Sequence, residues 1–337
     1  MLFELPGFEH IDAKDVKEAV TCLKAYDGKA SVIAGATDLL ALMKDRIEGP
    51  KLKVPAALVN IKNIPGIGRI TRENETGLRM GAAVTLSQIA ASGEITPKFG
   101  ILSQAARMVG TTQIRNMGTL GGNLCQRPRC VYFRHAHFVC FKKGGARCYA
   151  AAGEHRFYHS ILKKGKCVMA HPSDMAPALV ALKAGAVIAG VKGERIVPLQ
   201  DFFLGPDNVG ETILKSDEFI LAVEVPDQPA GTRQIFLKQR VRQAADFALA
   251  SVATVARITD GICKDISIVL GGVAPLPYVA KTAGEMIEGH ALTERLISDA
   301  AGEALDGARP LPMNQYKVDL TRAMVKRALT SMIESNT

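Results

Sequence analysis

Five of the seven cysteines in this 337-residue chain lie between residues 125 and 167, together with four of its seven histidines. Thiolates are ligands for zinc and for iron–sulfur clusters, and histidine can complete a zinc site. No C-x2-C pair occurs, so the spacing alone leaves three interpretations open: a bound metal, redox-sensing thiols, or unmetallated core cysteines. The residues concerned are Cys125, Cys130, Cys140, Cys148, Cys167, His135, His137, His155 and His159.

The same stretch carries the excess positive charge of the chain. Of 42 Lys and Arg against 33 Asp and Glu, ten basic residues and one acid, Glu154, lie in residues 125–167, which leaves the remainder neutral. A cluster held by four thiolates is negative and needs nearby cations or N–H donors. We therefore expect the charge to offset such a cluster, and Lys163, Lys164 and Lys166 to help form a docking face for a redox partner.

The neutral remainder argues against general binding of nucleic acid or anionic membrane. No stretch approaches the roughly 20 apolar residues of a membrane span, and the N-terminal residues MLFELPGFEHIDAKD have neither a basic nor an apolar signal region. We expect a cytoplasmic protein without direct membrane insertion. An odd number of cysteines cannot all pair in disulfides.

Two glycine-rich segments lie outside this stretch. Ile33-Ala34-Gly35-Ala36-Thr37-Asp38 precedes an apolar helical run, and a helix N-terminus favours an anion such as a pyrophosphate. An ordinary strand-to-helix turn is the alternative. The second, Gly118-Thr119-Leu120-Gly121-Gly122-Asn123, allows close backbone approach. Neither matches the Gly-x-Gly-x-x-Gly fingerprint of dinucleotide-binding proteins.

The elements that must position these residues form a mixed α and β pattern in three parts. Residues 1–62 read as a small α/β unit, with helices over 12–25 and after Thr37 or Asp38, and strands over 30–34 and 56–61. Residues 63–226 contain the stretch at 125–167. The sequence there predicts two strands within 68–84, helices over 86–91 and 99–108, a loop over 110–123, a helix from Ser173-Asp174 to 183, and strands over 186–191, 195–197 and 218–225.

The polar, breaker-rich segment 227–231 predicts the last domain boundary. In residues 232–335 the sequence predicts a three-stranded antiparallel sheet, covered by two helices. The strands are expected over 234–241, 248–258 and 266–270, and the helices over 280–288 and 320–333.

Four motifs in this order resemble the FAD-binding medium subunit of the molybdenum hydroxylases, the group of xanthine dehydrogenase, aldehyde oxidoreductase and carbon monoxide dehydrogenase. They are AGATDLL from Ala34, IRNMGTLGGN from Ile114, SDMAPAL from Ser173 and GGVAP from Gly271. The resemblance spans nearly the whole chain. It implies an α+β fold: a two-part FAD-binding domain of the vanillyl-alcohol-oxidase and CO-dehydrogenase flavoprotein type, and a C-terminal α/β domain.

By this resemblance the first loop holds the FAD pyrophosphate, and Asp174 helps to anchor the cofactor. Ile220 and Lys238 are expected near the isoalloxazine, where a cation stabilises the reduced ring. The alternative for Lys238 is an exposed strand lysine. The implied FAD-binding residues are Ile33, Ala34, Gly35, Ala36, Thr37, Asp38, Leu39, Thr111, Gly118, Thr119, Gly122, Asn123, Cys125, Asp174, Ile220 and Lys238.

The cysteine-bearing stretch resembles an insert that binds a [4Fe-4S] cluster in two kinds of medium subunit, those of 4-hydroxybenzoyl-CoA reductase and of the periplasmic aldehyde oxidoreductase. NLCQRPRCVYFR from Asn123 and HPSDMA from His171 look more like the second. The resemblance implies Cys130, Cys140, Cys148 and Cys167 as cluster ligands. Cys125 would lie beside the flavin, or be a small buried apolar residue.

The implied function is electron transfer, with no catalytic residue on this chain. A large subunit with the molybdenum cofactor oxidises an aldehyde or N-heterocycle, a small subunit with two [2Fe-2S] clusters relays electrons, and FAD passes them to an acceptor protein or small molecule. One alternative is the reverse flow of a 4-hydroxybenzoyl-CoA reductase type of enzyme. A remote alternative is a zinc-stabilised binding or assembly protein. Export with a signal-bearing small subunit would place the chain in the periplasm.

Overall fold

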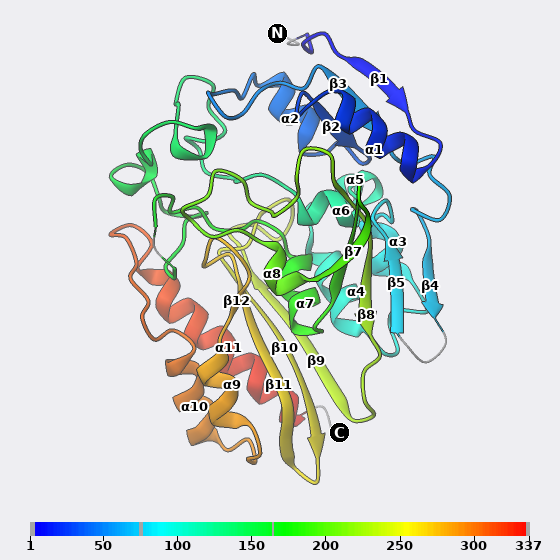
Figure 1. The fold of residues 1–337 in the computed structure, drawn as a ribbon. Helices are drawn as coiled ribbons and strands as arrows, with labels where there is room; N and C mark the ends of the chain where they lie inside the picture. Colours follow the sequence, from blue (N-terminus) through cyan, green and yellow to red (C-terminus); the bar gives the residue numbers. More distant parts are fainter. Residues whose placement is uncertain (1–3, 74–76, 164, 335–337) are drawn as a thin grey trace.

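Three sheets follow one another along the chain in the computed structural model (Figure 1), which describes residues 4–73, 77–163 and 165–334. The first sheet is parallel, in the order β1-β3-β2, with a helix in each crossover. The sequence does not predict β1, since three of its four residues are exposed. The elements are β1 (Glu9–Asp12), α1 (Val16–Ala25), β2 (Ala30–Ile33), α2 (Leu39–Lys44) and β3 (Ala57–Asn60).

The second sheet is antiparallel, in the order β4-β5-β8-β6-β7. Its strands are β4 (Ile70–Glu73), β5 (Gly77–Gly81), β6 (Gly185–Gly190), β7 (Gly193–Pro198) and β8 (Phe219–Pro226). Its helices are α3 (Leu86–Ala91), α4 (Gly100–Met108), α5 (Thr112–Met117), α6 (Leu120–Leu124), α7 (Met175–Ala181) and α8 (Leu199–Phe202).

The prediction of a loop over 110–123 is wrong, because this segment contains α5 and α6. Both helices begin at a threonine: the Thr111 side chain accepts a hydrogen bond from Ile114 N, and that of Thr119 accepts one from Gly122 N. Such caps satisfy otherwise unpaired N–H groups. The helices have six and five residues, too few to show a helical period in a glycine-rich sequence.

The third sheet is antiparallel as predicted, but it has four strands in the order β12-β11-β10-β9. The added β12 has two residues, too few for an alternating pattern. Three helices of the described chain accompany the sheet, and the sequence predicts only two of them, α9 and α11. The elements are β9 (Thr232–Gln239), β10 (Ala250–Thr259), β11 (Ile262–Gly271), β12 (Tyr278–Val279), α9 (Lys281–Ile287), α10 (Glu294–Glu303) and α11 (Tyr316–Glu334).

Residues 125–167, here called the insert, have no α-helix or strand in their described part; they form loops and two short 3-10 turns, Phe141–Lys143 and Tyr149–Ala151 (Figure 1). A small apolar cluster joins the insert to α2 and the residues after it. On another side, Lys317 of α11 donates hydrogen bonds to the carbonyl oxygens of Phe157, His159 and Gly272. The insert therefore contacts both α2, in the N-terminal part of the chain, and α11, in the C-terminal part. None of the helices described is long and apolar enough to cross a membrane.

Candidate functional site

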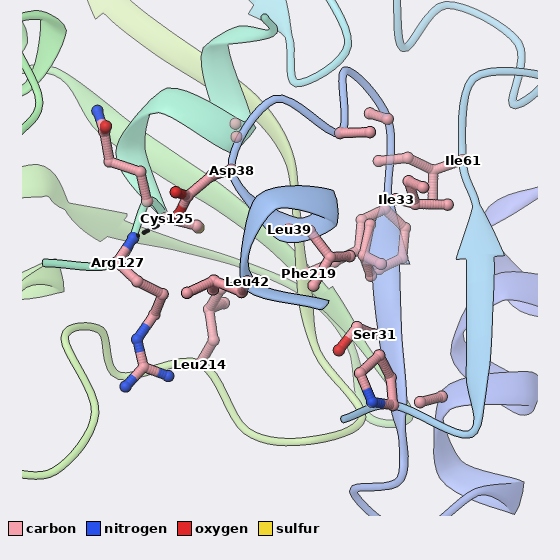
Figure 2. A pocket seen from close by; sticks show the side chains of 18 of the residues that line it. Ser31, Ile33, Asp38, Leu39, Leu42, Ile61, Cys125, Arg127, Leu214 and Phe219 are labelled. Carbon is pink, nitrogen blue, oxygen red and sulfur yellow. Dashed lines mark hydrogen bonds between the residues drawn. The ribbon is translucent and has the colours of Figure 1, made fainter. Parts of the chain in front are cut away.

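Two adjoining pockets, with volumes of about 380 and 230 Å3, form an elongated cleft. The larger lies between β2 of the first sheet and β8 of the second, and the smaller continues past α5 and α6 to Phe247. Apolar side chains such as Ile33 and Phe219 line one part of the larger pocket, and Asp38 and Arg127 lie toward its other end (Figure 2). This size is typical of a site for a small organic ligand or cofactor. Five residues line both pockets: Thr37, Asp38, Thr119, Gly122 and Gln126.

Fifteen of the sixteen residues expected to bind FAD line this cleft. The whole first loop, Ile33 to Leu39, lines the larger pocket with Thr119, Gly122, Cys125 and Ile220. The smaller pocket is lined by Thr37, Asp38, Thr111, Gly118, Thr119, Gly122, Asn123 and Asp174. The two glycine loops therefore form one site, although about 80 residues separate them in the sequence.

The two loops meet backbone to backbone. A Cβ atom on Gly35 would collide with the carbonyl oxygen of Met117, so no other residue fits there without a shift. The next residue, Ala36, has a φ of 60°, in the left-handed region that non-glycine residues rarely adopt. Backbone in this conformation persists where the surrounding structure holds it, often at a binding site.

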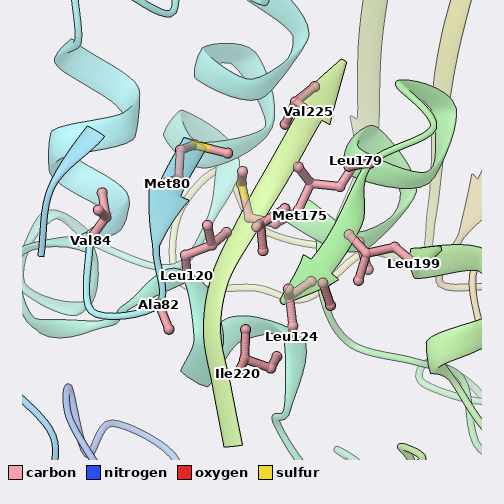
Figure 3. Packing of buried hydrophobic residues seen from close by; sticks show 14 of the residues in the cluster. Met80, Ala82, Val84, Leu120, Leu124, Met175, Leu179, Leu199, Ile220 and Val225 are labelled. Carbon is pink, nitrogen blue, oxygen red and sulfur yellow. The ribbon is translucent and has the colours of Figure 1, made fainter. Parts of the chain in front are cut away.

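The second loop and α6 are held in place by buried apolar side chains (Figure 3). Leu120 and Leu124 of α6 lie in the same core cluster as Met175 of α7 and Ile220 of β8. At its end, Asn123 Oδ1 accepts a hydrogen bond of 2.6 Å from Ser173 Oγ. The second loop and the segment that begins α7 are thus held together.

Lys238 is the expected FAD residue that lines neither pocket in the described part of the chain. It is also not an exposed strand lysine: its side chain is fully buried, and Nζ lies 2.6 Å from Asp174 Oδ2 and 3.0 Å from Met108 O. Burial raises the pKa of Asp174, and Lys238 acts in the opposite direction. Lys238 therefore contacts Asp174, which lines the smaller pocket, but does not line that pocket itself. Its direct contact with a flavin stays a prediction.

Three insert residues that the sequence analysis did not assign to the site also line the cleft: Gln126, Arg127 and Arg129. The Arg129 guanidinium lies 4.4 Å from the ring centroid of Phe247, another unassigned residue of the smaller pocket. Burial lowers the pKa of Arg129 to about 10, although Asp38 partly opposes this. The basic character of the insert was the available signal for the arginines; we see none for Phe247.

Cys125 lines the larger pocket, half-buried, and is not among the residues around the other insert cysteines. Burial, with a smaller contribution from Glu211, raises the pKa of its thiol to about 12. A thiol with this pKa is a poor nucleophile at neutral pH. Its position agrees with either interpretation made from the sequence, a cofactor neighbour or a small apolar residue.

Four cysteines of the insert, Cys130, Cys140, Cys148 and Cys167, line one small cavity of about 10 Å3, here called the cysteine cavity. Backbone N–H groups point at the sulfur atoms: those of Tyr132 and Phe133 at Cys130, of Lys142 and Lys143 at Cys140, of Ala150, Ala151 and Val168 at Cys148, and of Met169 at Cys167. The Cys167 thiol is also hydrogen-bonded to Cys148, which lowers the pKa of Cys148 to about 6.

The insert histidines stand apart from the cysteine cavity. His155 accepts a hydrogen bond from Met313 N at Nε2, and His135 and His137 are exposed. His159 is buried, and its ring nitrogens have no hydrogen-bond partner among the described residues. Within residues 4–73, 77–163 and 165–334, no three His, Cys, Asp or Glu side chains converge closely enough to bind a single metal ion. This arrangement does not fit a mononuclear zinc site.

Two fully buried lysines flank the cysteine cavity. Lys143 interacts electrostatically with Cys140 and Cys130, and Lys142 with Cys167. Their ammonium groups donate hydrogen bonds to His135 O, at 2.8 Å, and Gly210 O, at 3.1 Å. Two positive charges of the insert therefore face inward, and that of Lys142 lies 3.5 Å from the buried carboxylate of Glu211. Lys163 and Lys166 are exposed, and Lys164 lies outside the described residues.

Comparison with known proteins shows that two domain families match this chain, one after the other. The FAD binding domain in molybdopterin dehydrogenase matches residues 6–228, more than half of the chain. The CO dehydrogenase flavoprotein C-terminal domain matches residues 235–332. The chain belongs to the FAD-binding subunits of the molybdopterin dehydrogenases.

Individual relatives agree with this family. The FAD-binding subunit of an aldehyde oxidoreductase of Escherichia coli (strain K12) is 33% identical over 310 residues, which cover 90% of each chain. The carbon monoxide dehydrogenase medium chain of Hydrogenophaga pseudoflava is 28% identical and covers 97% of each. A solved structure of carbon monoxide dehydrogenase from the latter organism matches with a TM-score of 0.78 at 27% identity, covering 98% of this chain and 99% of that one. The α+β fold expected from the sequence is thereby confirmed.

Proposed function

We propose that this FAD-binding subunit transfers electrons between FAD in the elongated cleft and a [4Fe-4S] cluster in the cysteine cavity. The observation that carries the proposal is the segment from Cys167 to Asp174, which begins at the cysteine cavity and ends at the cleft. Seven residue steps span at most about 25 Å, so the two sites lie in one part of the molecule.

The cleft fits FAD in shape and in chemistry. Its apolar part suits a planar ring, and its glycine loops let backbone N–H groups approach a pyrophosphate. Within the insert, the buried Nε of Arg129 has no hydrogen-bond partner among the described residues, so a donor remains for an anionic ligand. Residues Ile33 to Leu39, Thr119, Gly122 and Asn123 would hold the cofactor, with Asp174 beside it and Lys238 neutralising Asp174.

The cysteine cavity fits an iron–sulfur cluster in its donor set. Four thiols with backbone N–H groups directed at sulfur, and two buried lysines, supply the ligands and counter-charges that such a cluster needs. At about 10 Å3 the cavity has room for about one water molecule, so the thiol side chains must turn outward to admit a cluster. Bound FAD and a bound cluster supply reversible electron transfer, in single steps at the cluster and in ones or pairs at the flavin.

The rest of the reaction belongs to partner subunits. We propose a large subunit with the molybdenum cofactor and a small subunit with [2Fe-2S] clusters, and aldehydes or N-heterocycles as substrates. The 33% identity to an aldehyde oxidoreductase subunit favours oxidation of aldehydes over the reductive alternative. Within this chain, we propose that residues 1–62, 63–226 and 232–335 act as the two FAD subdomains and the C-terminal domain.

Iron and flavin content test this proposal. The purified chain should contain FAD and, apart from any partner clusters, about four irons. In Cys148→Ser these irons should be lost, while FAD still binds when supplied in excess. Cys22→Ser, a half-buried cysteine of α1, is the control and should keep both. Full iron content in Cys148→Ser, or zinc in place of iron, would contradict the assignment.

A further inference from the structure

Asp38 of the first glycine loop is held almost entirely by the insert. Its Oδ1 lies 2.6 Å from Arg134 Nη2 and 2.8 Å from Arg129 Nη2. Its Oδ2 accepts a hydrogen bond of 2.7 Å from Arg127 N (Figure 2). Although Asp38 occupies the N-cap position of α2, its side chain makes no capping hydrogen bond there. We call Asp38, Arg129 and Arg134 the Asp38 clasp.

A second, apolar contact joins the same two segments. Leu42 of α2 and Ile47 lie in one buried cluster with Cys130, Phe133 and Cys140 of the insert. Two of these five residues are proposed cluster ligands. The helix that continues the first glycine loop therefore belongs to the same apolar cluster as three residues that line the cysteine cavity.

The Asp38 clasp also leaves positive charge at the cleft. One carboxylate faces two guanidinium groups, and the three side chains are only 15–19% exposed. Arg129 lines the smaller pocket, and its buried Nε has no partner among the described residues. Arg134 lines neither pocket, so it can act on a ligand in the cleft only through Asp38 and the insert backbone.

We propose that the Asp38 clasp couples the two sites, so that filling of the cysteine cavity and binding of FAD strengthen one another. The inference rests on the proposed function. A cluster fixes Cys130 and Cys140, which orders the insert; the ordered arginines hold Asp38, and Asp38 holds the loop that binds FAD. Such coupling is reciprocal by thermodynamic necessity. Arg134 is a positioning residue in this scheme.

The test measures the FAD dissociation constant of the full chain, stripped of FAD and titrated with it by flavin fluorescence. Arg134→Ala should weaken FAD binding about tenfold, within the usual range for coupled sites. Arg134→Lys should restore part of the affinity. The control is Arg156→Ala, an exposed insert arginine whose side chain contacts Glu154 and Phe157 of the insert; its carbonyl oxygen, which accepts from Tyr316, is unchanged by the substitution, so the constant should not change.

The decisive measurement is a double-mutant cycle with Cys148→Ser. Loss of the cluster should itself weaken FAD binding about tenfold, and Cys148→Ser with Arg134→Ala should be little weaker than either single variant, because both break the same link. An unchanged FAD constant in a Cys148→Ser chain that has lost its iron overturns the coupling. Retained iron in Cys148→Ser overturns the proposed cluster instead.

A purely structural role for Arg134 gives another result. Arg134→Ala then lowers the unfolding temperature but leaves the FAD dissociation constant unchanged. The FAD dissociation constant of the double variant then changes by the product of the two single-variant factors. This also overturns the coupling. If Arg134→Ala does not fold, Cys148→Ser alone decides, by its FAD constant and iron content.

Discussion

Lys143 places a positive charge beside two proposed cluster ligands, with its side chain fully buried. A cluster gains negative charge when it is reduced, so a nearby cation favours the reduced form. Lys143→Met keeps the apolar stem and removes the charge. We expect the cluster's reduction potential to fall by on the order of 60 mV, a tenfold change in a one-electron equilibrium.

A redox titration followed by electron paramagnetic resonance measures this potential. Lys163→Met is the matched control, because Lys163 is an insert lysine with an exposed side chain. Its potential should stay at the wild-type value. Equal potentials in all three proteins would show that Lys143 does not tune the cluster.

His159 is buried as a neutral ring, and burial lowers its pKa from 6.5 to about 4. Between these two values the unfolded chain binds a proton that the folded chain does not. The free energy of unfolding therefore decreases as the pH falls from about 6.5 toward 4, by up to about 1.4 kcal/mol per pH unit from this residue.

His159→Leu removes this dependence without leaving a hydrogen-bond partner unpaired, because neither ring nitrogen of His159 has one among the described residues. Urea unfolding at several pH values between 4 and 7 should give the variant a shallower slope than the wild type. Parallel curves would mean that His159 takes up its proton in the folded state.

At the scale of elements, the cleft depends on contact between the loop before α2 and the end of α5. Gly35→Ala would drive a methyl group into Met117 O, so the loops must separate. We expect a loss of about 1–3 kcal/mol in unfolding free energy, as for overpacking elsewhere, and FAD binding weakened at least tenfold. Gly68→Ala is the control, since a Cβ atom there meets no neighbour within 4 Å. Similar FAD constants for the two variants would contradict this role of the contact.

The sequence predicts most of the longer elements because a buried strand or an amphipathic helix leaves a periodic pattern. The exception is α10, which was not predicted although its buried Ile297, Ala300 and Ala301 have helical spacing. The buried face of α1, with Ala19, Val20 and Leu23, and the buried strand β3 are such cases. Short elements leave no periodic pattern. Threonine caps stabilise the first turns of α5 and α6, and β12 is defined by its pairing with β11. Asp38 is also not predictable from a local pattern. Its residue type is typical of a helix N-cap, but its side chain pairs with Arg134 of the insert and makes no capping hydrogen bond.

At the scale of the whole molecule, Lys317 joins the C-terminal domain to the insert. Its ammonium group, with a pKa that burial lowers to about 7, donates to Phe157 O, His159 O and Gly272 O at 2.6–3.0 Å. Lys317→Met would remove the donor to the buried Gly272 O and to the part-buried Phe157 O, whereas His159 O keeps a hydrogen bond from Asn314 Nδ2. We expect unfolding free energy to fall by about 3 kcal/mol.

Urea unfolding of the full chain measures this effect. Lys281→Met, which changes a lysine side chain that is 81% exposed, is the control and should be neutral. An equal midpoint for the two variants would show that Lys317 does not link the domains energetically.

By itself, the sequence determined the family, the α+β class, the two glycine loops and the four cysteines, because each of these depends on residue type and local order along the chain. The tertiary structure alone decided that the loops share one cleft, that Lys238 contacts Asp174, and that two buried lysines flank the thiols. It also brought Asp38 to Arg134, 96 residues away. Contacts between distant residues depend on how the sheets and the insert pack, and no local pattern in the chain encodes that packing.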